Sequence, residues 1–193
     1  MRVTVIASGS KGNTTLVETK SKNILIDAGI SSKEIKKRLN KDINIDLLFI
    51  THAHVDHIKG LKSVYKEFKP TVFSRNDEVI EKNICDITYF DKPYILDDLE
   101  VSYFNLSHDS DCIGINIKEG SKELVYITDT GYINKKILTN IVNKDMYIIE
   151  SNHDVKLLMN GKYPFFLQQR ILSDKGHLSN KDCSRYLSTL IGD

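Results

Sequence analysis

Short apolar runs dominate the first quarter of the chain and predict a set of β-strands. They alternate with turn residues, such as the two glycines between residues 8 and 13. Valine, isoleucine, leucine and threonine fill these runs, which is typical of strands that pack against a core. Strands are therefore predicted at residues 3–7, 14–19, 24–26 and 46–50.

Helical spacing of apolar residues follows two of these runs. A serine at position 31 or 32 can cap a first helix that carries Ile35 and Leu39 on its apolar side. A second helix is expected directly after His57, because apolar residues then recur at intervals of three and four until Pro70 ends the pattern.

The second half of the chain repeats the order of strands followed by helices. A β-rich stretch is predicted from residue 86 to residue 128, and a further strand at residues 146–149. Helices are predicted at about residues 132–143, 153–160 and 164–172, and from residue 178 onward. Strand-rich blocks that alternate with helices predict an α/β fold of the αββα sandwich class, formed as a single domain over residues 1–193.

Composition and charge narrow the functional classes. The length suits one domain with its own core, and no apolar run approaches the roughly 20 residues that a membrane span needs. The N-terminus lacks the features of a signal peptide, and the three cysteines show no metal or disulfide spacing, so a cytoplasmic protein is expected. The net charge of +1 gives no global attraction for nucleic acid, although it does not exclude it.

The strongest chemical signal is a group of ligand-type side chains that directly follows the predicted strand at residues 46–50. His52 and His54 can project to one side of an extended loop and reach one metal ion, and Asp56 and His57 can reach a second. Imidazole and carboxylate ligands suit zinc, and also manganese or iron. The alternative, an exposed and inert helix start, is disfavoured by four such residues within six positions.

Two later residues complete a possible ligand set. His108 follows a predicted strand, and Asp129 lies between an apolar strand and a glycine turn. Each alone would more often be a surface or turn residue. Their positions after successive strands, together with the histidine cluster, favour metal binding for both.

Six motifs together resemble the YycJ/WalJ-like hydrolases of the metallo-β-lactamase superfamily, a group related to tRNase Z. They span residues 8–180 and are Ser-Gly-Ser-x-Gly-Asn at 8–13, Leu-Ile-Asp-Ala-Gly at 25–29, Thr-His-Ala-His-Val-Asp-His-Ile-Lys-Gly at 51–60, Thr-Asp-Thr-Gly-Tyr at 128–132, Glu-Ser-Asn-His-Asp at 150–154 and Gly-His-Leu-Ser-Asn at 176–180. The resemblance implies the metallo-β-lactamase form of the αββα sandwich and two divalent metal ions, zinc or alternatively manganese or iron.

The resemblance also implies a role for each site residue. His52, His54 and His108 would hold one metal, and Asp56 and His57 the other, with Asp129 bridging the two.

Catalytic roles would fall to Asp56 and to the pair Glu150 and His177, whose histidine would protonate the leaving oxygen. Asp27 would orient a ligand histidine. For Ser10 and Asn13, phosphate binding and a simple turn remain alternatives, and for His153 packing and substrate contact remain alternatives.

One departure concerns the end of the chain. Members of this family carry one more strand, with a His that is the last ligand of the second metal, so a fold that lacks the last strand and helix is expected here. Either His177 then serves both roles, or the second metal lacks a protein ligand.

The leading hypothesis is a metal-dependent phosphodiesterase or nuclease that acts on DNA or RNA through a hydroxide held by two metals. The alternatives are hydrolysis of a thioester or lactone carbonyl, and a catalytically inactive, shortened binding protein. The sequence indicates a nucleic-acid partner and no membrane, and leaves the oligomeric state open.

Overall fold

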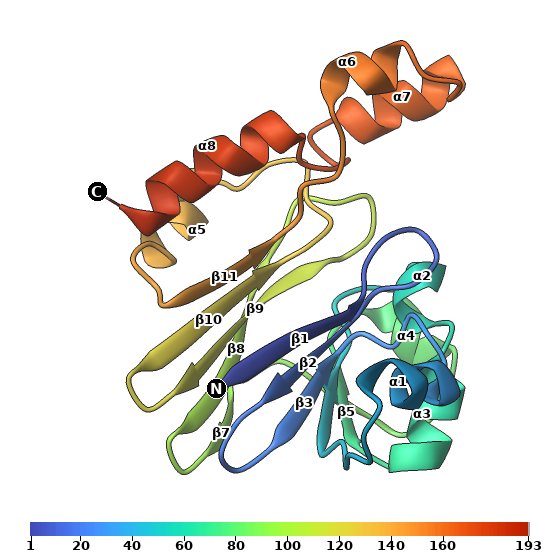
Figure 1. Ribbon diagram of the computed structural model, residues 1–193, viewed down its shortest axis with the longest axis vertical. Coiled ribbons are helices and arrows are strands. Elements are labelled where there is room, and N and C mark those ends of the chain that lie inside the picture. The colour runs from blue at the N-terminus through green and yellow to red at the C-terminus, as the bar shows by residue number, and fades with distance from the viewer. Residues whose placement is uncertain (193) are drawn as a thin grey trace. The chain divides into compact units, whose positions relative to one another are not determined.

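The computed structural model describes residues 1–192 and divides into two compact units, Met1–Pro93 and Tyr94–Asp193. The first contains a sheet of six strands and the second a sheet of five, each with helices of its own (Figure 1). Two sheets with flanking helices are the components of the predicted α/β class. A single domain over residues 1–193 stays a prediction.

The first unit orders its strands as they occur in the chain. The first three strands are antiparallel, and from β3 to β6 each strand runs parallel to the next. Parallel strands end at the same edge, so the loops after β3 and β4 begin side by side. The strands are β1 (Arg2–Ala7), β2 (Thr14–Glu18), β3 (Asn23–Ile26), β4 (Leu47–Phe49), β5 (Thr71–Ser74) and β6 (Ile87–Tyr89).

Four helices accompany this sheet, and their apolar residues form one core with it. Ile35, Leu61 and Val64 are buried against Leu25 and Leu48 of the sheet. The helices are α1 (Ser32–Leu39), α2 (Val55–Ile58), α3 (Leu61–Phe68) and α4 (Asp77–Glu81). Neither β5 nor α4 was predicted from the sequence.

The single helix predicted after His57 is wrong in one respect, because two helices meet there. Lys59 and Gly60 separate α2 from α3, and the Gly60 N–H donates to the Ala28 carbonyl instead of continuing a helix. A Cβ at Gly60 would lie 1.9 Å from the Ile30 carbonyl oxygen, so the close approach of this loop requires a glycine.

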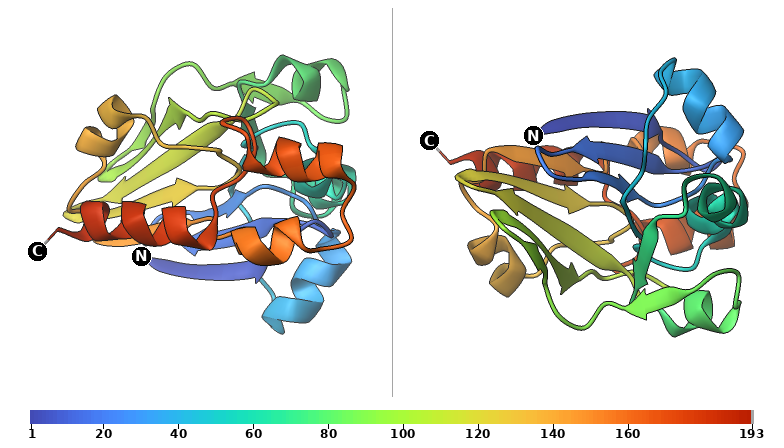
Figure 2. Two further views of the ribbon diagram at one scale, coloured as in Figure 1. Left: turned by 90° about the horizontal axis from the view of Figure 1, so that it is seen from above. Right: turned by 90° about the horizontal axis from the view of Figure 1, so that it is seen from below.

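The second unit places its strands in the order β11, β10, β9, β8, β7. β10 and β11 are parallel, and the other neighbours are antiparallel. Helix α8 (Asn180–Ile191) lies along β11 (Figures 1 and 2), where the Tyr147 hydroxyl donates to the Leu190 carbonyl. The strands are β7 (Tyr94–Leu96), β8 (Leu99–Asn105), β9 (Ile113–Glu119), β10 (Lys122–Ile127) and β11 (Met146–Ile149).

Three shorter helices belong to the same unit: α5 (Lys135–Asn140), α6 (Val155–Met159) and α7 (Phe165–Leu172). The helix predicted at 132–143 is too long, because the Asn134 side chain caps α5 by accepting from the Ile137 N–H. Strand β11 lies at the edge of its sheet, beside a groove lined by Ile149, Leu187 and Ile191 among others. Within residues 1–192, no helix is both long enough and apolar enough to cross a bilayer.

Candidate metal centre

The loop after β4 carries the four ligand-type residues of the histidine motif. It is extended up to His54, which adopts β-type backbone angles, and α2 then begins at Val55. His52 and His57 are fully buried, whereas His54 and Asp56 are half-buried. Buried imidazoles in a loop need polar partners, and each of these has one.

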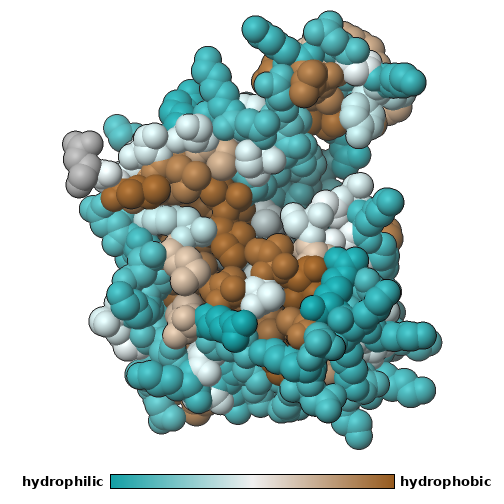
Figure 3. All heavy atoms as spheres, in the orientation of Figure 1, coloured by the Kyte–Doolittle hydropathy of each residue, from teal (hydrophilic) through white to brown (hydrophobic). Residues whose placement is uncertain are grey.

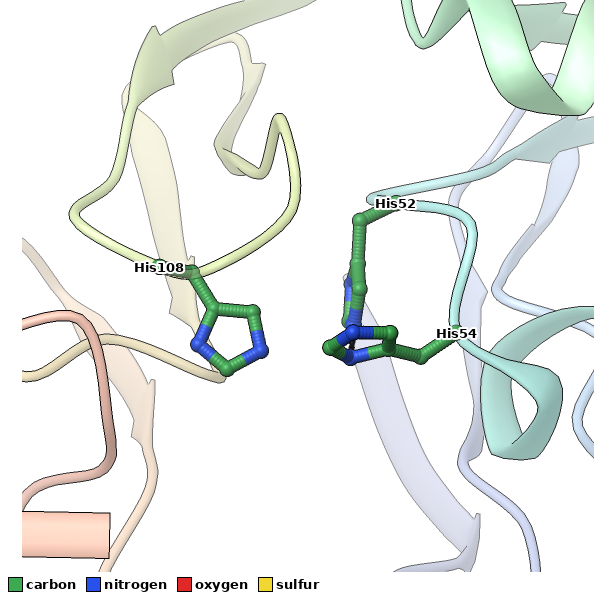
Figure 4. Close-up of side chains that lie close together, drawn as sticks. All are labelled: His52, His54 and His108. Carbon is green, nitrogen blue, oxygen red and sulfur yellow. Dashed lines mark hydrogen bonds between the residues drawn. The ribbon is translucent and has the colours of Figure 1, made fainter. Parts of the chain in front are cut away.

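His52 and His54 converge through one nitrogen each. His52 Nε2 lies 3.0 Å from His54 Nδ1, and the two rings meet edge to face (Figure 4). The Thr51 hydroxyl lies 3.0 Å from His52 Nδ1, which leaves Nε2 to face His54. Two imidazole nitrogens bound tetrahedrally at the usual zinc distance would be about 3.3 Å apart, so this spacing suits a shared ion.

Asp27 lies against His57, the histidine that it contacts in the first unit. It follows β3 and is fully buried. One carboxylate oxygen accepts the Thr51 backbone N–H at 2.8 Å, and the other lies 2.7 Å from His57 Nδ1. A carboxylate at Nδ1 favours the tautomer that has its proton there, and this tautomer presents an unprotonated Nε2.

The Asn13 side chain contacts both His57 and Asp56. Its side-chain amide donates to Asp56 Oδ2 at 2.9 Å and lies 3.0 Å from His57 Nε2. The two acceptor atoms are 3.6 Å apart. The Asn13 amide therefore contacts both acceptor atoms. A cation placed between these two atoms would interact with them in the same way.

Gly29 allows the loops of this unit to approach each other closely. A Cβ at this position would lie 1.8 Å from the Asp56 carbonyl oxygen and 2.3 Å from the Asn13 nitrogen. The Gly29 N–H donates to the Asn13 carbonyl, and the Asn13 N–H donates to the Asp56 carbonyl. The Ala-Gly pair after Asp27 thus ties the turn at 8–13 to the histidine motif.

The second unit holds a second group of ligand-type residues. His108, Asp129 and His177 offer ligand atoms that all lie within 4.8 Å of one another. His108 is buried in the loop after β8, and its Nδ1 lies 3.2 Å from the Gly176 carbonyl oxygen, a common partner for a ligand histidine. Figure 4 shows its ring projecting from this loop.

His177 lies between two carboxylates. Its Nδ1 is 3.0 Å from Glu150 Oε2 and 3.2 Å from Asp129 Oδ1. Burial disfavours the charged imidazole, but the two carboxylates outweigh this and raise the pKa of His177 to about 10. Burial also raises the pKa of Glu150, an effect that its hydrogen bond to His177 partly offsets.

Backbone contacts fix this pair in place. Glu150 Oε1 accepts the Thr130 N–H at 2.5 Å, beside Asp129. Asp129 has a φ of 54°, a left-handed conformation that aspartate tolerates better than most residues. Gly176 precedes His177, and a Cβ there would lie 2.2 Å from the Ile171 carbonyl oxygen.

The remaining predicted residues lie outside these two groups. Ser10 is exposed in the turn between β1 and β2. His153 pairs with Ser179 through its backbone, and among residues 1–192 neither of its buried ring nitrogens has a hydrogen-bond partner. Burial lowers the pKa of His153.

Sequence reasoning missed the supporting residues. Thr51 links Asp27 to both His52 and His57, and Thr130 links Asp129 to Glu150. Each is a threonine next to a predicted ligand, a position that could have suggested its role. The ion pair between Arg170 and Asp109 joins residues 61 apart and has no such local signal.

Known proteins resemble this chain in sequence and fold. A model of the metallo-beta-lactamase superfamily matches residues 7–83. The chain is 32% identical over its whole length to the exodeoxyribonuclease WalJ of Streptococcus pneumoniae strain D39, and covers 77% of it. It is 34% identical to the exodeoxyribonuclease YycJ of Bacillus anthracis, again over its whole length, and covers 78% of that protein.

Among solved structures, the short form of human tRNase Z matches 97% of this chain, which covers 88% of that structure, with a TM-score of 0.73 and 14% identity. This likeness confirms the mixed α/β fold with two sheets. The identity to WalJ and YycJ over the full chain confirms the resemblance carried by the six motifs. The chain therefore belongs to the metallo-β-lactamase superfamily of metal-dependent hydrolases.

Proposed function

We propose that this protein hydrolyses phosphodiester bonds in nucleic acid, with DNA as its substrate. The relatives named exodeoxyribonucleases support the reaction class and the choice of DNA. The observation that carries the proposal is the pair Glu150 and His177 beside Asp129. Cleavage of a phosphodiester needs a proton for the leaving oxygen, and an imidazole held by two carboxylates keeps one available.

In this proposal, His52, His54 and His108 hold one divalent ion, and Asp56, His57 and Asp129 hold a second. The donor chemistry fits, because every proposed ligand atom is an imidazole nitrogen or a carboxylate oxygen. The convergence of His52 on His54 and of Asp56 on His57 supports it. When bound, such ions would polarise the scissile phosphate and activate water.

The ions are zinc in the first instance, with manganese or iron as alternatives. Asp56 contributes as a metal ligand. It also accepts a hydrogen bond from the Asn13 side-chain amide, and this bond positions Asp56 and Asn13 relative to each other. We place the protein in the cytoplasm, in keeping with its three free cysteines.

The test is hydrolysis of bis-p-nitrophenyl phosphate and of a labelled oligodeoxynucleotide by the zinc-loaded and the manganese-loaded protein. Wild type should cleave both, and His177→Gln should lose about 100-fold or more on the oligonucleotide, whose leaving group is a poor one. It should lose much less on the nitrophenyl ester, because nitrophenolate leaves without a proton.

An equal loss on both substrates would contradict the proton-donor role of His177. Turnover of a thioester with no cleavage of either phosphodiester would favour the carbonyl alternative. Metal binding without turnover of any of these substrates would favour an inactive binding protein.

A further inference from the structure

Helices α6 and α7 form a hairpin that projects from the second unit (Figure 1) and exposes many large apolar side chains. Phe165 and Phe166 are 70% and 73% exposed, and Tyr163 is 56% exposed. Figure 3 shows apolar side chains on this projection next to hydrophilic ones. Exposed apolar patches of this kind usually mark an interaction site.

The charge of the hairpin differs from that of the whole chain. Residues 155–173 contain Lys156, Lys162 and Arg170 and no acidic residue, whereas the chain as a whole is nearly neutral at +1. Both lysines are exposed, and Arg170 pairs with Asp109, next to His108. Aromatic rings interleaved with cations favour a partner that combines flat rings and negative charge.

The hairpin also starts and ends at the candidate catalytic pair. Helix α6 begins five residues after Glu150, and α7 ends five residues before His177, whose backbone N–H donates to the Ile171 carbonyl at 3.0 Å. A polymer bound at Glu150 and His177 therefore has this hairpin within reach. No comparable run of exposed aromatic residues occurs elsewhere among residues 1–192.

The aromatic residues are held on a defined backbone. Gln168 is buried and its side-chain amide donates to the Tyr163 carbonyl at 2.9 Å, which ties the loop before Pro164 to α7. Asp154 caps α6 by accepting from the Leu157 N–H. Rings on fixed helices lose little entropy on binding, because only their own side-chain torsions need to be ordered.

We propose that the α6–α7 hairpin is a stacking platform for single-stranded nucleic acid, which leads the strand to the Glu150 and His177 pair. Bases of a single strand are free to stack on Tyr163, Phe165 and Phe166, and Lys156 and Lys162 contact the phosphates. Paired bases in a duplex do not expose their faces in this way. The inference rests on the nuclease function proposed above.

The first experiment measures binding of a labelled oligothymidylate of about 15 nucleotides by fluorescence anisotropy, in EDTA so that no cleavage occurs. Phe165→Ala/Phe166→Ala should bind about tenfold more weakly or worse. Phe165→Leu/Phe166→Leu keeps the apolar surface without the rings and should lose a similar factor. Tyr89→Ala is the matched control, because Tyr89 is 49% exposed in the other unit, and it should bind like wild type.

Four further measurements separate the alternatives. A duplex of the same length should bind more weakly than the single strand, and an abasic strand should abolish the difference between wild type and the alanine variant. Lys156→Gln/Lys162→Gln should lower the slope of log affinity against log salt by about 1.4. An oligouridylate should behave as the DNA strand does, because stacking does not read the sugar.

Several outcomes would overturn the proposal. Equal binding by wild type and both phenylalanine double variants would exclude stacking, and full binding by the leucine variant alone would indicate a merely apolar contact. A change in sedimentation from dimer to monomer in the alanine variant would assign the hairpin to a second copy of the chain.

Hydrolysis of bis-p-nitrophenyl phosphate separates this inference from the proposed function. The hairpin variants should hydrolyse it like wild type, since this small substrate does not reach the hairpin. If wild type cleaves no phosphodiester, the proposed function fails, and binding in EDTA still tests the platform.

Discussion

Replacing Asp27 with Asn tests whether the site depends on the tautomer of His57. The substitution keeps the size of the side chain, and asparagine tolerates the φ of 60° at this position as aspartate does. It changes one carboxylate oxygen into an NH₂ group. The Thr51 backbone N–H is always a donor, so the remaining oxygen must stay on Thr51 and the NH₂ must face His57 Nδ1.

This substitution should force the His57 imidazole into its other tautomer. Nδ1 would have to accept, which moves the proton of His57 to Nε2, the atom that lies 3.0 Å from the Asn13 amide. Protonated Nε2 has no lone pair for a metal. Loss of a partner that orients a ligand typically weakens metal binding about 10–100-fold, or about 1.4–2.7 kcal/mol. The buried charge-assisted hydrogen bond adds about 1.5–3 kcal/mol to folding, and this would also be lost.

The assay is competition for zinc against a chelating dye, with thermal unfolding in EDTA as the measure of stability. Asp46→Asn is the matched control, because Asp46 also accepts a backbone N–H in this unit, from Asn23 at 2.8 Å, without contacting a histidine. The control should lose stability only. Zinc affinity of Asp27→Asn within about twofold of wild type would refute the tautomer argument, whatever its stability.

Three other changes have defined outcomes. Gly29→Ala should destabilise the protein by about 3 kcal/mol or more in urea unfolding, since its Cβ would lie 1.8 Å from the Asp56 carbonyl oxygen. The control Gly120→Ala, whose Cβ would make only one contact at 3.5 Å, should cost about 1 kcal/mol. Equal losses of stability in the two variants would contradict the packing argument. Because the folded-state pKa of His177 is raised to about 10, its stabilising contribution to the metal-free protein is complete below about pH 6.5 and disappears as the pH rises through 10. His177→Gln should therefore be less stable than wild type by about 1–3 kcal/mol near pH 6 and nearly equal above pH 10, and a gap that widens with pH would reverse the sign of this argument. Zinc at about 100 times its dissociation constant should stabilise wild type by about 2.7 kcal/mol in thermal unfolding, and no shift would contradict metal binding to the folded state.

The sequence predicted most strands and placed the candidate ligands at strand ends, because both inferences depend on local patterns. Apolar runs ended by Asp27, by the histidine motif and by Asp129 mark strand ends, and these ends do carry the candidate ligands. The boundaries after His57 could not be predicted, since Gly60 is set by its contact with Ile30, which is distant in sequence.

The supporting contacts were also beyond prediction. Asn13 was expected either to bind phosphate or to form a turn, and its contacts with Asp56 and His57 join residues 43 and 44 positions apart. A hydrogen bond between distant residues leaves no periodic signal in a single sequence. The sequence motifs include Asn13, Asp56 and His57, but only the folded structure shows which of them form hydrogen bonds with each other.

The two groups of candidate ligands share one construction, in which a carboxylate after one strand contacts both a neighbouring loop and a histidine. Asp27 follows β3 and accepts the N–H of Thr51, which follows the adjacent parallel strand β4; Glu150 follows β11 and accepts the N–H of Thr130, which follows the adjacent parallel strand β10.

In each case the second carboxylate oxygen takes an imidazole Nδ1, of His57 at 2.7 Å or of His177 at 3.0 Å. Adjacent parallel strands end at one edge, so a carboxylate after one strand lies next to the backbone that follows the other. One side chain thereby fixes both a loop and a histidine tautomer. A substitution at either carboxylate should thus disturb the loop and the chemistry together, whereas a substitution at the histidine alone should leave the loop in place.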